Sequence, residues 1–251
     1  MSMSSSGATV VLADRFRIGN VLGRTMGVLS RHVVLFVLVA AVAQLPNLLL
    51  ALFNPAIRPR PGGSQLITAA VVGWLVIMVI IPITQTVLYH AAFQDMLGRP
   101  IRVGDSLALA LRRFFPILGA VICMGVLIIL GFMLLVVPGI MLATALAITI
   151  PVCVVEQIGP FASIRRSAFL TKGNRWRILG IWLLVAVVTL VASGLALLFK
   201  HALGMDAGAI LGFVMQSVVS AFTTLAAVVM YHDLRVAKEG VDTNRIAAVF
   251  D

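Results

Sequence analysis

The stretch that decides the fold is residues 114–155, FFPILGAVICMGVLIILGFMLLVVPGIMLATALAITIPVCVV, which carries no charged side chain. A helix needs about 20 apolar residues to cross the hydrocarbon core of a bilayer. The stretch is about twice that length, and it contains Pro138-Gly139, a dipeptide typical of turns. It therefore predicts two membrane-spanning helices, near 117–136 and 139–156, joined by a tight turn.

The rest of the chain has the same character. Of its 251 residues, 61% are hydrophobic and 11% are charged, whereas soluble proteins are roughly 45–50% apolar and about 25% charged. Further uncharged runs bring the number of predicted spans to six. The spans lie near residues 33–53, 67–94, 117–136, 139–156, 177–199 and 208–232. We therefore expect an all-α polytopic membrane protein with six transmembrane helices arranged as three hairpins.

The positive charges indicate which way the protein is inserted. With six spans, four segments share one side of the membrane. They are the N-terminus, residues 95–116, residues 156–177 and the C-terminus. Of the 19 Lys and Arg residues, only Arg58, Arg60 and Lys200 lie on the other side. Such an excess over short loops marks the cytoplasmic side, so both termini are expected there. A net charge of +10 placed around a membrane face argues against a nucleic-acid partner.

An amphipathic basic stretch precedes each odd-numbered span, which predicts a threefold repeat of interfacial helix, span, turn and span. The repeat units cover about 16–98, 101–159 and 160–239 of a single membrane domain, 1–251. Residues 1–14 are expected to be a disordered N-terminus, and 241–251 a short polar tail. The apolar stripes consist of Ile18, Leu22, Met26 and Leu29 in the first unit, Val103, Leu107, Leu111 and Phe114 in the second, and Phe161, Ile164 and Ala168 in the third.

Interfacial helices place their cations among lipid headgroups, where each charge contributes roughly 1 kcal/mol of attraction to an anionic leaflet. The sequence thus predicts membrane lipids, above all anionic phospholipid, as partners. The candidate headgroup-binding residues are Arg17, Arg24, Arg31, Arg102, Arg112, Arg113, Arg165, Arg166, Lys172 and Arg175. The alternative interpretation is that these cations only determine topology.

Acidic and histidine side chains gather at the predicted cytoplasmic ends of the second, fourth and sixth spans. We expect structural ion pairs there, involving Asp95, Glu156 with Arg165 or Arg166, and Asp233 with Arg235 or a neighbouring loop. A metal site is the alternative, but no familiar ligand spacing is present, and no cofactor is expected. Its ligands would be His90, Asp95, Glu156, His232 and Asp233.

Several motifs resemble a known family. They are Pro138-Gly139-Ile140, the run Arg166-Ser167-Ala168-Phe169-Leu170-Thr171-Lys172-Gly173, and Tyr231-His232-Asp233-Leu234-Arg235. They resemble the membrane domain named after glycerophosphoryl diester phosphodiesterases and the related YciC-like bacterial inner-membrane proteins. The resemblance implies a six-span bacterial inner-membrane module. It does not imply phosphodiesterase activity, which belongs to a soluble partner domain.

Three functions are compatible with this pattern. The first is a non-enzymatic module that organises anionic lipids or partner proteins, including other copies of itself, at the cytoplasmic face. The second is a transporter or channel, which predicts a polar cavity near Gln85, Gln216 and Thr223. The third is a membrane enzyme acting on headgroups, which predicts that the five acidic and histidine residues named above converge. The absence of a recognisable catalytic motif favours the first.

Overall fold

The computed structural model describes residues 18–52 and 63–239, and in these ranges its regular structure is entirely α-helical. The predicted disordered segment 1–14, the polar tail 241–251 and Arg17 lie outside the described residues. The helices are α2 (Ile18–Arg31), α3 (Val33–Leu52), α4 (Gly63–Met96), α5 (Val103–Arg112), α6 (Phe114–Leu134), α7 (Val136–Ala145), α8 (Thr149–Val155), α9 (Pro160–Thr171), α10 (Arg175–Leu203) and α11 (Met205–Glu239).

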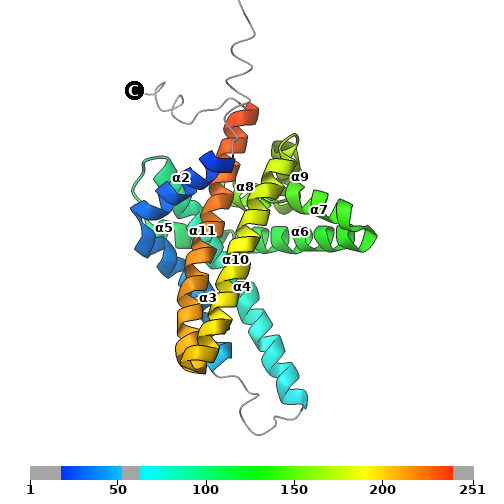
Figure 1. The fold of residues 1–251 in the computed structure, drawn as a ribbon. Coiled ribbons are helices and arrows are strands. Elements are labelled where there is room, and N and C mark those ends of the chain that lie inside the picture. The colour runs from blue at the N-terminus through cyan, green and yellow to red at the C-terminus, as the bar shows by residue number, and fades with distance from the viewer. Residues whose placement is uncertain (1–17, 53–62, 240–251) are drawn as a thin grey trace, which may run out of the picture.

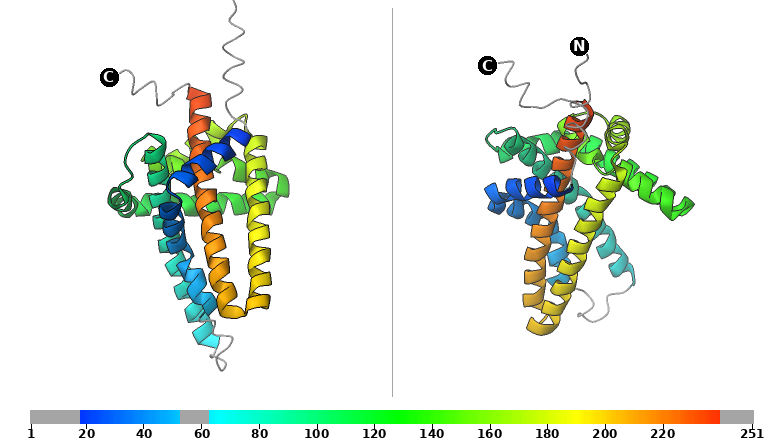
Figure 2. Two further views of the ribbon diagram at one scale, coloured as in Figure 1. Left: turned by 60° about the vertical axis from the view of Figure 1, so that its left-hand side comes forward. Right: turned by 45° about the horizontal axis from the view of Figure 1, so that its top comes forward.

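Four long helices, α3, α4, α10 and α11, form a bundle, and α11 packs against each of the other three (Figure 1). The hairpin of α6 and α7 lies crosswise to this bundle in both further views (Figure 2). The short helices α2 and α9 lie towards the end of the bundle opposite the turn between α10 and α11. The three predicted hairpins therefore do not share one arrangement.

The chain is a helical protein with several helices suited to a membrane. Four described stretches are long and apolar enough to cross it: Phe114–Leu134, Val136–Val155, Arg175–Leu203 and Ala207–Glu239. The count rises to five if Ile18–Arg31 and Val33–Pro46, which are bent by 96°, are taken as one span. A bend of this size also suits a helix that lies along the membrane surface before a span. Six spans and a threefold repeat remain predictions.

The turn within the crosswise hairpin falls earlier than we predicted. The helical hydrogen bonding is interrupted at Leu135, and Pro138 lies inside the first turn of α7. Proline is tolerated there because the first backbone N–H groups of a helix have no partner within it. Gly139 allows the two helices to touch, since a Cβ at this position would meet Cα and the ring of Phe132. The predicted fourth span is broken further between α7 and α8.

The segments before the second and third predicted units, Asp95–Gly98 and Glu156–Gly159, both begin with an acidic residue and end in glycine, but they do not share a backbone conformation. Gly98, after α4, has a positive φ of 68°, which is typical of the residue that ends a helix. The corresponding Gly159 has a φ of −74°, and Gln157 adopts the left-handed conformation instead, with a φ of 52°. The two segments therefore differ in geometry although they begin and end with similar residues.

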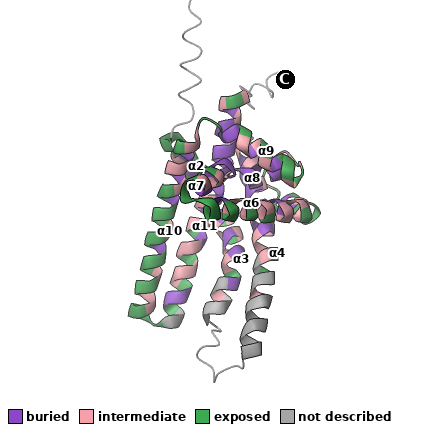
Figure 3. Cartoon of the chain, turned by 90° about the vertical axis from the view of Figure 1, so that its right-hand side faces the viewer, coloured by how far each residue is buried: buried purple, intermediate pink, exposed green. Residues whose placement is uncertain are grey.

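The buried core lies around the second half of α11, where it meets α2, α3, α4, α8, α9 and the first turns of α10 (Figure 3). Leu225, Met230, Tyr231 and Leu234 of α11 are almost wholly buried. In contrast, α10 and the α6–α7 hairpin expose long rows of apolar side chains, which include Leu190 and Met133. Exposed apolar surface of this extent is what a protein dissolved in lipid presents.

Candidate functional site

Helix α9 has an inverted amphipathic pattern. Its buried face carries the small polar residues Ser163, Ser167 and Thr171. Ser167 and Thr171 both donate hydrogen bonds to the backbone carbonyl of Ala145, at 2.8 and 3.2 Å. Its outer face carries Phe161, which is 72% exposed, together with Phe169. A helix that buries hydroxyls and exposes aromatic rings is suited to a lipid environment.

Helix α5 shows the same inversion. Its buried residues are Ser106 and Ala110. The predicted apolar stripe of Val103, Leu107 and Leu111 is exposed, Leu111 by 59%. The stripe is therefore not covered by the protein, and it is available to the membrane.

Helix α2 buries Val21, Thr25, Val28 and Leu29, mainly against α11. Of the predicted apolar stripe only Leu29 lies on this buried face, and Met26 is 60% exposed. All three short helices thus present uncovered apolar residues, which the sequence pattern alone did not assign to either side.

Exposed cations accompany these outward apolar residues. Arg102 and Arg112 flank α5, while Arg165 and Lys172 lie on α9 and at its C-terminal cap. None of these four forms an ion pair with a described carboxylate. On α9, Phe161, Arg165 and Phe169 recur every four residues, so that aromatic rings and a cation share one helix face. Trp176, at the start of α10, is 85% exposed.

Two further headgroup candidates are close to the same helices. Arg113 donates a 3.4 Å hydrogen bond to the side-chain oxygen of Gln157. The Nε atom of Arg175 is buried and has no hydrogen-bond partner among the described residues. An N–H group in that position is costly unless an acceptor reaches it.

The predicted headgroup residues of α2 are instead engaged with buried acids. Arg24 pairs with Asp233 of α11 at 2.5 Å, and Arg31 lies 3.6 Å from Asp95 of α4. Both carboxylates are buried, whereas the two arginines remain more than half exposed. We expected Asp233 to pair with Arg235 or a neighbouring loop, but its partner is Arg24, which lies in helix α2 and is 209 residues away in sequence.

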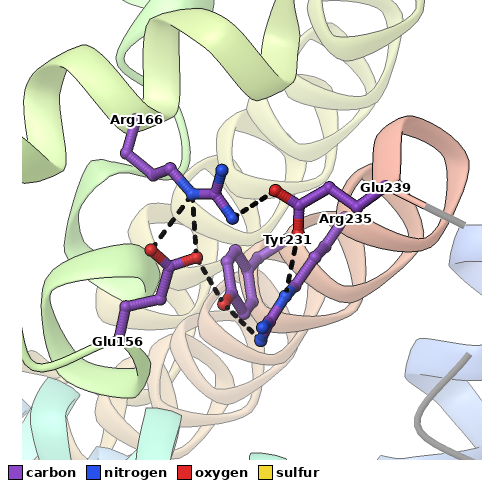
Figure 4. Close-up of polar contacts among 5 residues, drawn as sticks. All are labelled: Glu156, Arg166, Tyr231, Arg235 and Glu239. Carbon is purple, nitrogen blue, oxygen red and sulfur yellow. Dashed lines mark hydrogen bonds and ion pairs between the residues drawn. The ribbon is translucent and has the colours of Figure 1, made fainter. Parts of the chain in front are cut away.

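Five side chains from three parts of the chain form a closed ring of hydrogen bonds (Figure 4). Arg166 of α9 donates from Nε to both carboxylate oxygens of Glu156, at 3.0 and 3.1 Å. Its Nη2 atom lies 2.5 Å from Glu239 at the end of α11. Of the two arginines expected as partners of Glu156, the structure thus brings Arg166 to it and leaves Arg165 outside.

Residues of α11 complete the ring. Arg235 donates from Nε to Glu239 at 3.3 Å and from Nη1 to the hydroxyl of Tyr231 at 3.2 Å. That hydroxyl donates to Glu156 at 3.0 Å. The residues Tyr231, Arg235 and Glu239 follow at intervals of four, so they share one face of α11. This spacing is a sequence signal for the ring, but our sequence analysis did not use it for Tyr231 or Glu239.

The ring also changes the acidity of Arg166. Burial alone lowers the pKa of its guanidinium, but the hydrogen bonds and charges of Glu156 and Glu239 outweigh burial and raise that pKa above its ordinary value. Arg166 therefore stays charged, and its cation is neutralised by protein carboxylates rather than offered to lipid. It is better described as a structural residue than as a headgroup ligand.

The acidic and histidine residues proposed as an alternative metal site are divided among separate contacts. His90 lies 2.8 Å from Ser106 and 3.2 Å from Gln94 through its two ring nitrogens. Asp95 and Asp233 pair with α2, and Glu156 belongs to the ring. Among residues 18–52 and 63–239, no group of three His, Cys, Asp or Glu side chains is placed to hold a metal ion.

A transporter was expected to have Gln85, Gln216 and Thr223 at a single cavity, and two of these three residues line the same cavity. Gln85 and Thr223 line a cavity of about 440 Å³ between α4, α6, α7, α10 and α11, but most of its other walls are apolar. Gln216 lines a different cavity, of about 380 Å³, together with Gln44.

Comparison with known proteins gives one family match. No curated protein and no solved structure matches the chain, so the resemblance of residues 138–240 to phosphodiesterase membrane domains receives no support. A family model described as a domain of unknown function, DUF7847, matches residues 107–234, just over half of the chain. The match extends from α5 into α11 and includes Glu156, Arg166 and Tyr231. The chain therefore belongs to the DUF7847 family.

Proposed function

We propose that this protein is a non-enzymatic integral membrane module that binds anionic phospholipid at the cytoplasmic face. The observation that carries the proposal is the inverted pattern of α5 and α9, which expose apolar side chains beside cations that have no described carboxylate partner. Apolar residues can enter the upper hydrocarbon region while Arg102, Arg112, Arg165 and Lys172 reach phosphate oxygens. The buried Nε of Arg175 is a further donor for such an oxygen.

The proposed orientation follows from the same charges. With α3, α4, α10 and α11 as spans, the termini lie on one side whether the α6–α7 hairpin crosses twice or not at all. The excess of Lys and Arg at that end makes it the cytoplasmic end of a protein in a bacterial inner membrane. Recruitment of a protein partner or of a second copy to the same face is an alternative use of this surface.

The other two functions have less support. A transporter would use the cavity that Gln85 and Thr223 line, although its largely apolar walls suit a lipidic substrate better than a polar one. A headgroup enzyme would need free carboxylates, whereas Asp95, Glu156 and Asp233 are engaged in ion pairs.

The test is binding of phosphatidylglycerol to delipidated protein, measured by native mass spectrometry. Each surface charge contributes about 1 kcal/mol, so the Arg165→Gln/Lys172→Gln variant should bind this lipid roughly thirtyfold more weakly. The charge-preserving Arg165→Lys/Lys172→Arg variant should bind as the parent does. Lys200→Gln, at the other end of α10, is the matched control. Equal binding by all variants would show that these cations serve topology only.

A further inference from the structure

The cavity between the crosswise hairpin and the bundle has the size of a ligand site. Its volume is about 440 Å³, within the range of about 300–1,000 Å³ that is usual for small-molecule sites. Met124, Ile128 and Phe132 of α6 form part of its wall, and Leu179 of α10 contributes on the bundle side. Both helices are among those long and apolar enough to cross a membrane, and in the membrane placement proposed above lipid hydrocarbon surrounds them.

One residue of this apolar lining, Trp182, carries a hydrogen-bond donor without a partner in the part of the chain that the structure describes. The indole Nε1 of Trp182 is buried and has no partner among the described residues. None of the three threonine hydroxyls in the described lining, those of Thr144, Thr223 and Thr224, accepts a hydrogen bond from it, and each donates to a carbonyl of its own helix. The cavity therefore favours a ligand that brings an acceptor, such as a carbonyl oxygen, to Trp182.

The lining also argues against a charged ligand. None of the described residues that line the cavity is Lys, Arg, His, Asp or Glu. A carboxylate or phosphate placed there would lose its hydration without gaining a counter-charge, which is far more costly than burying a neutral ester.

The position of Trp182 along α10 matches the level of lipid esters. Trp182 follows Arg175 by seven residues, or about 10 Å at 1.5 Å per residue. If Arg175 lies among the headgroups, which occupy roughly the outer 5–8 Å of each leaflet, the indole lies near the top of the hydrocarbon core. Glycerol esters join headgroup to acyl chain at this boundary.

We propose that this cavity binds one acyl chain of a membrane phospholipid, whose ester carbonyl accepts a hydrogen bond from Trp182 Nε1. The site recognises the tail and the ester rather than the headgroup charge. It therefore does not depend on the cationic surface of α5 and α9, and it accepts zwitterionic as well as anionic phospholipid.

The experiment uses Trp182 as its own reporter. In the Trp74→Phe/Trp176→Phe variant, Trp182 is the remaining tryptophan. The delipidated protein in detergent is titrated with phosphatidylcholine brominated along its acyl chains, and quenching of Trp182 fluorescence is followed. Quenching should saturate, and Ala143→Phe, which fills the cavity, should weaken it at least tenfold. Ala186→Phe on the exposed face of α10 is the matched control and should leave it unchanged.

Two additional variants test the same proposal independently. Ala147→Leu, a smaller addition to the lining, serves if Ala143→Phe does not fold. Trp182→Phe keeps an aromatic ring, although a smaller one, and removes the N–H, and it should lower retention of phosphatidylcholine in native mass spectrometry about three- to tenfold. Quenching that never saturates, or that Ala143→Phe and Ala147→Leu leave unchanged, overturns the proposal. Saturable quenching by brominated palmitate but not by the phospholipid overturns it in favour of a free fatty acid. Insensitivity to Arg165→Gln/Lys172→Gln separates this site from the cationic surface.

Discussion

The Nε atom of Arg166 donates to both carboxylate oxygens of Glu156, at 3.0 and 3.1 Å. This leaves the Nη2 atom of the same guanidinium for Glu239, 2.5 Å away. One side chain thereby ties α9 to the segment after α8 and to the end of α11. The neighbouring Arg165 points outward without a described carboxylate partner, so two adjacent arginines have different tasks.

Replacing Arg166 should destabilise the protein without weakening headgroup binding. Arg166→Gln leaves Glu156 and Glu239 without their cation, and because these groups remain 17% and 23% exposed, we expect a loss of about 1–3 kcal/mol. The measurement is reversible unfolding in mixed micelles. Arg165→Gln, one residue earlier, is the control and should change stability by less than about 0.5 kcal/mol. Equal losses in both variants would contradict a special role for the ring.

The pH dependence of this contribution follows from the raised pKa of Arg166. A base whose pKa is higher in the folded state stabilises the fold below its unfolded pKa, and the gain is lost only as the pH rises through the folded value. The stability difference between the parent and Arg166→Gln should therefore not fall as the pH is raised through the neutral range into the moderately alkaline range. Unfolding midpoints of the pair across that range provide the check, and a gap that closes near neutrality would refute the assignment.

Breaking the contact between α2 and α11 should release α2. In Asp233→Asn, Arg24 loses the buried carboxylate that holds it, while Asp95 still faces Arg31 and His32. We expect faster amide hydrogen exchange across residues 18–31 and little change in α10. Glu239→Gln, which removes a carboxylate six residues later in α11 that pairs with Arg166 and Arg235, is the comparison. Unchanged exchange in α2 would mean that its buried apolar face is sufficient to hold it.

The turn between α10 and α11 requires a glycine at 208. A Cβ there would collide with the backbone of Lys200, and backbone cannot move aside as a flexible side chain can. Gly208→Ala should therefore cost about 1–3 kcal/mol. Gly194→Ala in α10, where a Cβ would meet nothing within 4 Å, should be neutral or stabilising by up to about 1 kcal/mol. The measurement is the free energy of unfolding of the two variants. Similar values for both would show that α10 and α11 can move apart without a loss of stability.

Cysteine labelling can decide whether the crosswise hairpin crosses the membrane. In a Cys123→Ala/Cys153→Ala background, Ala202→Cys near the α10–α11 turn should react with a membrane-impermeant maleimide from outside. Leu135→Cys, at the exposed tip of the α6–α7 hairpin, should be protected from both sides because the hairpin lies across the bundle. Labelling of Leu135→Cys from outside would instead establish two crossings and restore six spans.

The helical class and the extent of the long helices could be predicted from the sequence, because the length of an uncharged run gives the approximate length of the helix that it forms. The predicted spans 177–199 and 208–232 lie within α10 and α11. The direction of α6 and α7 could not be predicted, since a helix that is apolar on every side has no face that identifies its neighbours. The turn was misplaced because Pro138 was taken as its centre rather than as a residue of the following helix.

Candidate site residues were predictable where the partner is local. Glu156 and Arg166 are ten residues apart, and their types and spacing suggested the pair. Asp233 was assigned to Arg235 for the same reason, but the bundle brings Arg24 closer. The lining of the large cavity combines residues from α4 to α11, so Trp182 carries no sequence signal that distinguishes it from any other membrane tryptophan.

The central place of α11 has a consequence for synthesis on the ribosome. This helix packs against α2, α3, α4, α8, α9 and α10, yet it is translated after all of them. Until α11 has been translated, the inward faces of the earlier helices lie in the membrane without the helix that covers them. A nascent chain released before about residue 220 would insert its first helices and still lack a core, so quality control of this protein has to recognise inserted but unpacked helices rather than failed insertion.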